Sequence, residues 1–213
     1  GGPDKAHVLS LPRKIRKLES PLISIPPRQA YIPGARSFSW EVSDVNEDDL
    51  RFSLHIRAED ESEWRVLVEK TTATHYTLDG RSLADGSYLL QVTASDLPGN
   101  PVELARESFL ISRPFLICNS LPMIEMGSPE ITASSARLQV QAKTTVSSIY
   151  QTEYSIDSGE WRIIYPADGI ADSQLETYEL RLDSLSRGEH SVKVRVVDSL
   201  GNIGNGRVTF AVQ

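Results

Sequence analysis

Apolar and polar residues alternate along most of the chain, a period of two that is typical of strands with one buried face. In the clearest segment Phe38, Trp40 and Val42 alternate with polar neighbours. The pattern recurs in four further segments: Phe52/Leu54/Ile56, Tyr88/Leu90/Val92/Ala94, Leu138/Val140/Ala142 and Val192/Val194/Val196. Clusters of Asp, Asn, Gly and Pro separate the segments, and no window shows helical spacing. The pattern therefore predicts an all-β chain of antiparallel strands.

The apolar phase of these strands also predicts the core. A slip of one residue would turn a whole strand's apolar set to solvent, so the phase is a strong constraint. We expect the following residues to be buried: Trp40, Leu54, Tyr88, Val92, Leu138, Val140, Val194 and Val196.

The second half of the chain repeats the first. Glu63–Leu67 matches Glu160–Ile164, and a second set of matches has an offset of 102: Leu83, Gly86, Tyr88, Val92, Asp96, Gly99 and Asn100 with Leu185, Gly188, His190, Val194, Asp198, Gly201 and Asn202. A repeat of about 100 residues fits a seven-stranded sandwich. The repeat predicts two tandem seven-stranded antiparallel β-sandwiches, residues 21–117 and 118–213. Residues 1–20 are interpreted as a basic connector or the end of a preceding domain.

Two motifs carry a family resemblance. Ser39-Trp40-Glu41-Val42 resembles the second strand of fibronectin type III domains, and Leu83–Tyr88 resembles their tyrosine corner. In the second half Val140 stands near the Trp position and His190 replaces the corner Tyr, which leaves the corner hydrogen bond open. The resemblance implies a fibronectin type III-like sandwich in each half.

The second half also resembles modules of bacterial extracytoplasmic proteins that often follow a β-propeller, and residues 1–10 resemble the last strand of a propeller blade. The resemblance implies a secreted, periplasmic or cell-surface protein of which this chain is a piece. It also implies a monomeric, non-catalytic spacer or interaction module, whose partners are the adjacent domain and a protein or glycan surface. The alternative is an accessory, carbohydrate-contacting domain of a propeller or carbohydrate-active enzyme.

Charge and composition exclude several classes of function. The net charge is −7, and the basic run at 13–17 leaves the rest of the chain more acidic still, which disfavours nucleic acid as a partner. No apolar stretch is long enough for a membrane helix, so we expect no membrane insertion. The single Cys118 and four scattered His give no zinc spacing, and Cys118 lies in an apolar run typical of a buried thiol.

One loop has the spacing of a calcium site. Asp44, Asn46 and Asp48 place oxygen ligands at alternate positions, as calcium loops do. The loop lacks the glycine and the final glutamate of an EF-hand, so an acidic, solvated turn is the alternative interpretation. We expect no other cofactor.

Further candidates are aromatic or acidic. Trp64 and Trp161 occupy equivalent turns, where they either stack on a partner such as a sugar or cover one sheet edge. Asp168, Asp172 and Glu176 could be paired carboxylates of a hydrolase, but they share one loop with no sign of a cleft. No nucleophile elbow, phosphate loop or metalloprotease motif occurs, so we expect no catalysis.

The link between the two halves is expected to be semi-rigid. Residues 114–122 and Met123 are rich in apolar side chains, whereas a flexible tether is rich in Gly and Ser. We expect these side chains to be buried and the loops 144–148 and 199–205 to approach the link.

Overall fold

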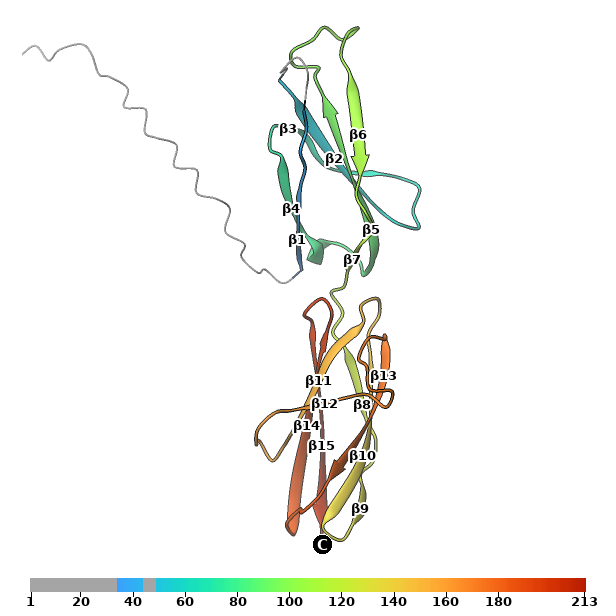
Figure 1. Ribbon diagram of the computed structural model, residues 1–213, viewed down its shortest axis with the longest axis vertical. Helices are drawn as coiled ribbons and strands as arrows, with labels where there is room; N and C mark the ends of the chain where they lie inside the picture. Colours follow the sequence, from blue (N-terminus) through green and yellow to red (C-terminus); the bar gives the residue numbers. More distant parts are fainter. Residues whose placement is uncertain (1–33, 44–48) are drawn as a thin grey trace, which may run out of the picture. The chain divides into compact units, whose positions relative to one another are not determined.

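The computed structural model describes residues 34–43 and 49–213, which form an all-β fold (Figure 1). The first strands are β1 (Ala35–Ser39), β2 (Arg51–Ala58), β3 (Arg65–Thr71), β4 (His75–Asp79), β5 (Gly86–Ser95), β6 (Glu107–Ile111) and β7 (Phe115–Ile117). The next are β8 (Met123–Met126), β9 (Glu130–Thr132), β10 (Ser135–Lys143), β11 (Ile149–Ile156), β12 (Arg162–Ile164), β13 (Leu175–Leu182), β14 (Gly188–Asp198) and β15 (Ile203–Val212). None of these described residues belongs to a helix long and apolar enough to cross a membrane.

Strands β1–β7, here called the N-terminal group, form two antiparallel sheets. One is β1–β4; the other has the order β3-β2-β5-β6, with β7 also paired to β5. A core of Ile56, Leu78, Tyr88 and Ile117 packs between them, and a second apolar cluster surrounds Leu54.

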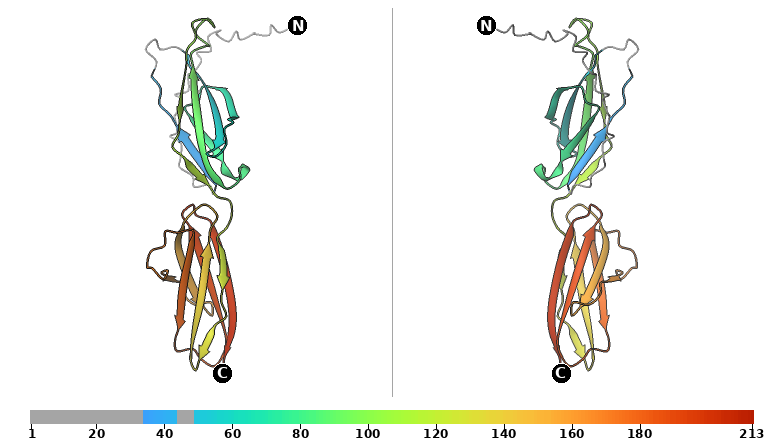
Figure 2. Two further views of the ribbon diagram at one scale, coloured as in Figure 1. Left: turned by 90° about the vertical axis from the view of Figure 1, so that its right-hand side faces the viewer. Right: turned by 90° about the vertical axis from the view of Figure 1, so that its left-hand side faces the viewer.

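Strands β8–β15, the C-terminal group, repeat this arrangement. One sheet has the order β13-β10-β8, with β9 also on β10, and the other β12-β11-β14-β15. The side views show the sheets of each group face to face (Figure 2). Tyr178 is fully buried in this core, and its hydroxyl is hydrogen-bonded at 2.8 Å to that of Thr152. Among the described residues, strands pair only within their own group.

The predicted core is largely confirmed, with two exceptions. Leu54, Tyr88, Leu138, Val140, Val194 and Val196 are buried. Trp40 and Val92 are only half-buried, so the prediction was wrong for them. β1 ends at Ser39, before Trp40, although the alternation continues to Val42. The core of the N-terminal group is therefore less buried around Trp40 and Val92 than around Leu54 and Tyr88.

Strand pairing identifies the counterpart of Trp40, near Val140 as expected. Phe38 pairs with Tyr76 in the N-terminal group, and Val140 pairs with Tyr178, the residue 102 positions later, in the C-terminal group. Val140 is therefore the counterpart of Phe38, and Ala142 is the counterpart of Trp40.

Both groups contain the corner hydrogen bond. The Tyr88 hydroxyl donates to the Ala84 carbonyl at 2.9 Å, which is the tyrosine corner of immunoglobulin-like sandwiches. In the C-terminal group His190 takes this role, since its Nε2 lies 2.8 Å from the Ser186 carbonyl, four residues upstream as for Tyr88. With these sheets, the corners show the expected fibronectin type III-like fold.

The histidine corner requires a protonated ring. The Nδ1 of His190 lies 2.7 Å from the Asp157 carboxylate, so both ring nitrogens face acceptors. A neutral imidazole has only one N–H, whereas the imidazolium has two. The hydrogen bond to Ser186 and the contact with Asp157 accordingly raise the pKa of His190 above its ordinary value.

Removing the Tyr88 hydroxyl should lower stability. Tyr88→Phe leaves the Ala84 carbonyl without its donor, at a cost of about 0.5–1.5 kcal/mol. Urea denaturation of the N-terminal group measures this cost. Tyr150→Phe, which alters an exposed ring, is the control and should be neutral; equal midpoints for wild type and Tyr88→Phe would contradict the role of the corner.

The histidine corner should make the C-terminal group less stable at alkaline pH. Because the folded pKa is raised, the stabilisation is fully present below the unfolded value of about 6.5 and is lost as pH rises through the folded pKa. Thermal midpoints between pH 5 and 9, followed by amide signals of β14, should show this decline. His190→Asn should abolish it, and His75→Asn, at an exposed position, should leave it intact.

Candidate functional site

A connected cluster of polar side chains lies where the two strand groups meet, and we call it the junction: Asp85, Cys118, Asn119, Ser120, Thr145, Ser147, Asp198 and Asn202. The Asp85 carboxylate accepts hydrogen bonds from the backbone N–H groups of Asn119 (2.6 Å) and Ser120 (3.3 Å). It also accepts one from the Thr145 hydroxyl, in the β10–β11 loop, at 2.9 Å. One side chain of the N-terminal group thus binds both the link and a loop of the C-terminal group.

The electrostatics of Asp85 fit this role. Partial burial by itself raises the pKa of the carboxyl, but the hydrogen bonds from Asn119, Ser120 and Thr145 outweigh it and lower the pKa to about 2. The carboxylate is therefore charged at any physiological pH, and hydrogen bonds to a charged acceptor are stronger than neutral ones.

Asn119 holds the link against the N-terminal group. Its side-chain amide donates to the carbonyls of Gly80 (3.1 Å) and Leu83 (2.8 Å). Both carbonyls belong to the turn at Gly80–Ser82 or its C-cap, just before the corner loop. The link is therefore fixed at its backbone and at its side chain.

Asn202 holds the link from the C-terminal group. Its Nδ2 donates to the Cys118 carbonyl at 3.0 Å and to the buried Asp198 carboxylate at 2.9 Å. Asp198 in turn accepts from the Ser147 hydroxyl at 2.7 Å and from the backbone amides of Leu200 and Asn202. This loop is therefore held rigid where it touches the link.

Cys118 is the buried free thiol that the sequence predicts. Its Sγ lies 3.5 Å from the Ser120 carbonyl and 3.6 Å from the Thr145 hydroxyl. The thiol packs in the middle of the junction.

The link departs in one respect from expectation. The loops 144–148 and 199–205 do contact it, since Thr145, Ser147 and Asn202 all bind Cys118. However, Leu121 and Met123 are each 61% exposed and Leu116 is 37% exposed, so the predicted burial of the apolar side chains was wrong for these three. Phe115–Ile117 belongs to β7, paired to β5, and is not part of a free link. Polar contacts take the place of the expected apolar ones.

Sequence reasoning did not single out Asp85, Asn119 or Asn202 as functional. Asp85 lies inside the corner motif, and Asn202 belongs to a turn whose Asp, Gly and Asn recur in both halves, so both were visible as motif members. Their role depends on contacts between segments distant in sequence.

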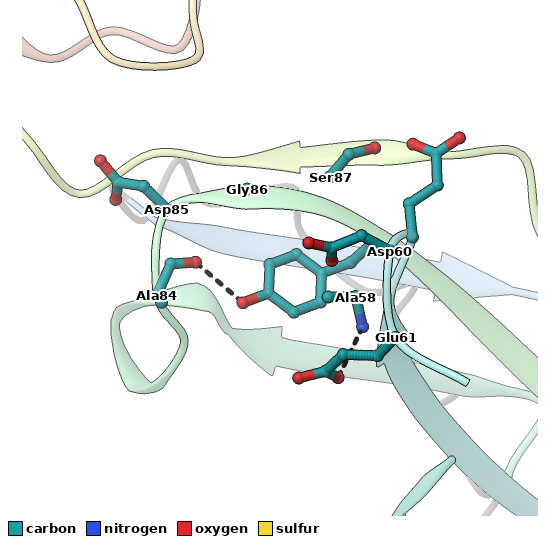
Figure 3. A pocket seen from close by; sticks show the side chains of 9 residues that line it. Ala58, Asp60, Glu61, Ala84, Asp85, Gly86 and Ser87 are labelled. Carbon is teal, nitrogen blue, oxygen red and sulfur yellow. Dashed lines mark hydrogen bonds between the residues drawn. The ribbon is translucent and has the colours of Figure 1, made fainter. Parts of the chain in front are cut away.

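A groove of about 540 Å³ lies beside the corner (Figure 3). Acidic residues line it, with Asp60 and Glu61 on one side and Asp85 on the other, and Ala84 and Tyr88, which share the corner hydrogen bond, also line it. Glu61 is already engaged, since it accepts from the Ala58 N–H at 3.1 Å. Within residues 34–43 and 49–213, no three His, Cys, Asp or Glu residues are grouped so that they could hold a metal.

The two predicted tryptophans are each stacked by an arginine. The Arg57 guanidinium lies 5.1 Å from the ring centre of Trp64, and that of Arg195 lies 4.5 Å from Trp161. Arg195 is also paired with Glu153. Trp161 is 40% exposed. In both groups one face of the ring is therefore covered by a cation, a favourable cation–π arrangement.

Of the three acidic residues expected to share one loop, Asp168 and Asp172 lie between β12 and β13, but Glu176 lies in β13, so the prediction was wrong for it. Glu176 is buried, and its carboxylate accepts from the backbone N–H groups of Asp172 (3.2 Å) and Ser173 (2.9 Å). Asp168 accepts from the Ile170 N–H at 3.2 Å. The predicted calcium ligands Asp44, Asn46 and Asp48 lie outside the described residues and stay a prediction.

Comparisons with known proteins concern structure alone. No family model matches the chain, and neither does any curated protein. The chain is similar to the CbhA fibronectin(III)-like modules of Clostridium thermocellum, with 17% identity over 85% of this chain and 86% of that one, at a TM-score of 0.38. It is also similar to the chicken CNTN1 FN1–FN3 domains, with 12% identity over 86% of this chain and 63% of that one, at a TM-score of 0.36.

Proposed function

We propose that the chain is a non-catalytic spacer: two tandem fibronectin type III-like sandwiches that hold a neighbouring domain at a fixed reach in an extracytoplasmic protein. The observation that carries the proposal is the set of hydrogen bonds from Asn119, Ser120 and Thr145 to the Asp85 carboxylate. A spacer must resist bending at its joints, and these bonds tie the link to both strand groups.

The composition of the link supports the same proposal. Flexible tethers are rich in Gly and Ser and have few fixed contacts. Here the backbone carbonyl of Cys118, the backbone amides of Asn119 and Ser120, and the Asn119 side chain all have partners. Ordering a link costs conformational entropy, which the contacts must offset. Ordering the link in this way is useful only if the relative placement of the two strand groups matters.

The stacked tryptophans favour the spacer over the carbohydrate-contacting alternative. Sugar rings bind on open aromatic faces, whereas Arg57 and Arg195 each cover one face of Trp64 and Trp161. We therefore propose that both residues brace the sheet surface, and that the partners of the chain are its adjacent domain and a protein surface.

Neutralising Asp85 should loosen the junction. Asp85→Asn keeps the shape of the side chain but removes the charge, which weakens each hydrogen bond to the acceptor by about 1 kcal/mol. We expect the amide protons of Asn119 and Ser120 to exchange about fivefold faster, as measured by NMR hydrogen exchange. Residual dipolar couplings should then need more than one relative orientation of the two groups.

Asp60→Asn is the matched control, since Asp60 lines the same groove and does not belong to the junction.

In the wild type, acid should weaken the protection of the Asn119 and Ser120 amides. Because the Asp85 pKa is lowered, protection of these amides should be full above the ordinary value of 3.8 and lost as pH falls toward 2. Unchanged protection in Asp85→Asn would contradict the spacer proposal.

A further inference from the structure

A row of large side chains crosses the outer face of the sheet β12-β11-β14-β15. Val197 of β14 pairs with Gln151 on one side and with Ile203 on the other. Its neighbours in the strand, Val196 and Asp198, are buried, so Val197 faces away from the core. Ile203 is 45% exposed. Two aliphatic residues therefore lie side by side on a face that points to solvent.

A β-bulge adds a tyrosine to this row. The pairing of β11 with β14 shifts its register between Ile149 and Gln151. Ile149 and Thr152 are both buried, so the bulge turns the two residues between them, Tyr150 and Gln151, to the outer side. Tyr150 is 68% exposed.

β12 adds a second tyrosine. Ile164 pairs with Thr152 and packs against the core, so its two neighbours point outward. Of these, Tyr165 is 68% exposed and Ile163 is 53% exposed. Contiguous exposed apolar side chains of this kind mark an interaction surface more often than scattered single ones do.

The N-terminal group has polar residues at the corresponding positions. Val197 corresponds to Ser95 at the offset of 102. Ser95 pairs with Arg51 on one side and with Glu107 on the other. The same fold is therefore built without apolar side chains at this place, and the row in the C-terminal group is not a requirement of the fold.

Two cations lie beside the row, directly opposite each other. Lys193 of β14 pairs with Arg207 of β15, and like charges at opposite positions destabilise a sheet. The Lys193 Nζ lies 3.3 Å from the Ser158 hydroxyl, and the Arg207 Nε donates to the Ser191 hydroxyl at 3.1 Å. Neither cation forms an ion pair with a carboxylate of the described ranges 34–43 and 49–213.

A third cation connects the charged pair to the aromatic side chains. Arg195 lies two residues from Lys193 along β14, on the same face. It is paired with Glu153, and its guanidinium lies 4.5 Å from the ring centre of Trp161. The three cations thus outnumber the one carboxylate paired with them, although the whole chain has a net charge of −7.

We infer that this face binds an acidic protein segment that also carries apolar side chains. The face is defined by six residues: Tyr150, Tyr165, Lys193, Arg195, Ile203 and Arg207. Tyrosine and arginine are enriched at the centres of protein interfaces, and carboxylates of a partner would supply the acceptors that the opposed cations lack. The inference rests on the proposed function only in taking a protein surface as the partner.

The aliphatic residues favour a protein segment over an acidic glycan. Val197 and Ile203 offer a sugar neither a ring to stack on nor a hydrogen-bonding group, but they pack well against apolar side chains. Arg195 also covers one face of Trp161.

An NMR titration of the full chain tests the chemistry of the partner. The probe is a synthetic peptide in which glutamates alternate with leucine and phenylalanine. It should shift the amide signals of β11, β14 and β15. Versions with lysine in place of glutamate, or with alanine in place of the apolar residues, should bind about tenfold more weakly. Equal binding of all three peptides, or no shift on this face, would overturn the inference. So would tighter binding of polyglucuronate at the same face, which would identify a glycan site.

Two sets of variants locate the site. Lys193→Glu with Arg207→Glu should weaken binding of the glutamate peptide about tenfold, and Ile203→Asn alone about threefold. The matched control is Lys143→Glu with Arg137→Glu, the same charge change at exposed positions of β10 in the other sheet. Equal weakening by both pairs would overturn the inference, because binding would then follow net charge alone.

The junction variant separates this inference from the spacer proposal. The face lies entirely within the C-terminal group, so Asp85→Asn should leave peptide binding unchanged even where it loosens the junction. Loss of binding in Asp85→Asn would show that the site is not confined to this face and would overturn the assignment.

Discussion

Carboxylates that accept hydrogen bonds from backbone N–H groups organise the turns of both sandwiches. Strand ladders satisfy their own N–H groups, but the turns leave amides that need an acceptor when they are partly buried. In this chain Asp and Glu side chains supply it at Arg81 (from Asp79), Asn119 (Asp85), Arg106 (Asp96), Ser191 (Asp157), Ser173 (Glu176) and Leu200 (Asp198). These carboxylates hold the turns in place. Their role in the fold accounts for this part of the acidic composition without acid–base chemistry.

Alternation was sufficient to predict the fold because the longer strands, such as β2, β10, β13 and β14, bury one face. A period of two fixes which side chains face the core, and most of the predicted set, including Leu54 and Val196, is buried. The failures at Trp40 and Val92 have a common origin. Trp40 lies beyond the end of β1, and Val92 pairs with Leu110, which is 71% exposed, so their burial depends on neighbouring segments and not on their own phase.

The candidate site was less predictable because its residues come from separate loops. Asp85 and Thr145 are 60 residues apart in the chain, and Asn202 and Cys118 are 84 apart. No local pattern encodes such pairs. The histidine corner illustrates the same limit: His190 breaks the tyrosine motif, yet its Nε2 reaches the Ser186 carbonyl because a ring at that position is held by the sheet and by Asp157.

The corner and the junction are mechanically connected. The Tyr88 hydroxyl holds the carbonyl of Ala84, the residue directly before Asp85, so the core of the sandwich fixes the loop that presents the carboxylate. The corresponding residues of the C-terminal group are His190 and Ser186, followed by Arg187 in place of Asp85.

A guanidinium donates hydrogen bonds and accepts none, so the second corner loop has no acceptor at this position for the amides of a following link. The two groups thus share a fold and a corner but not the means of joining. Asp85 makes this junction specific to the order in which the two groups stand in the chain.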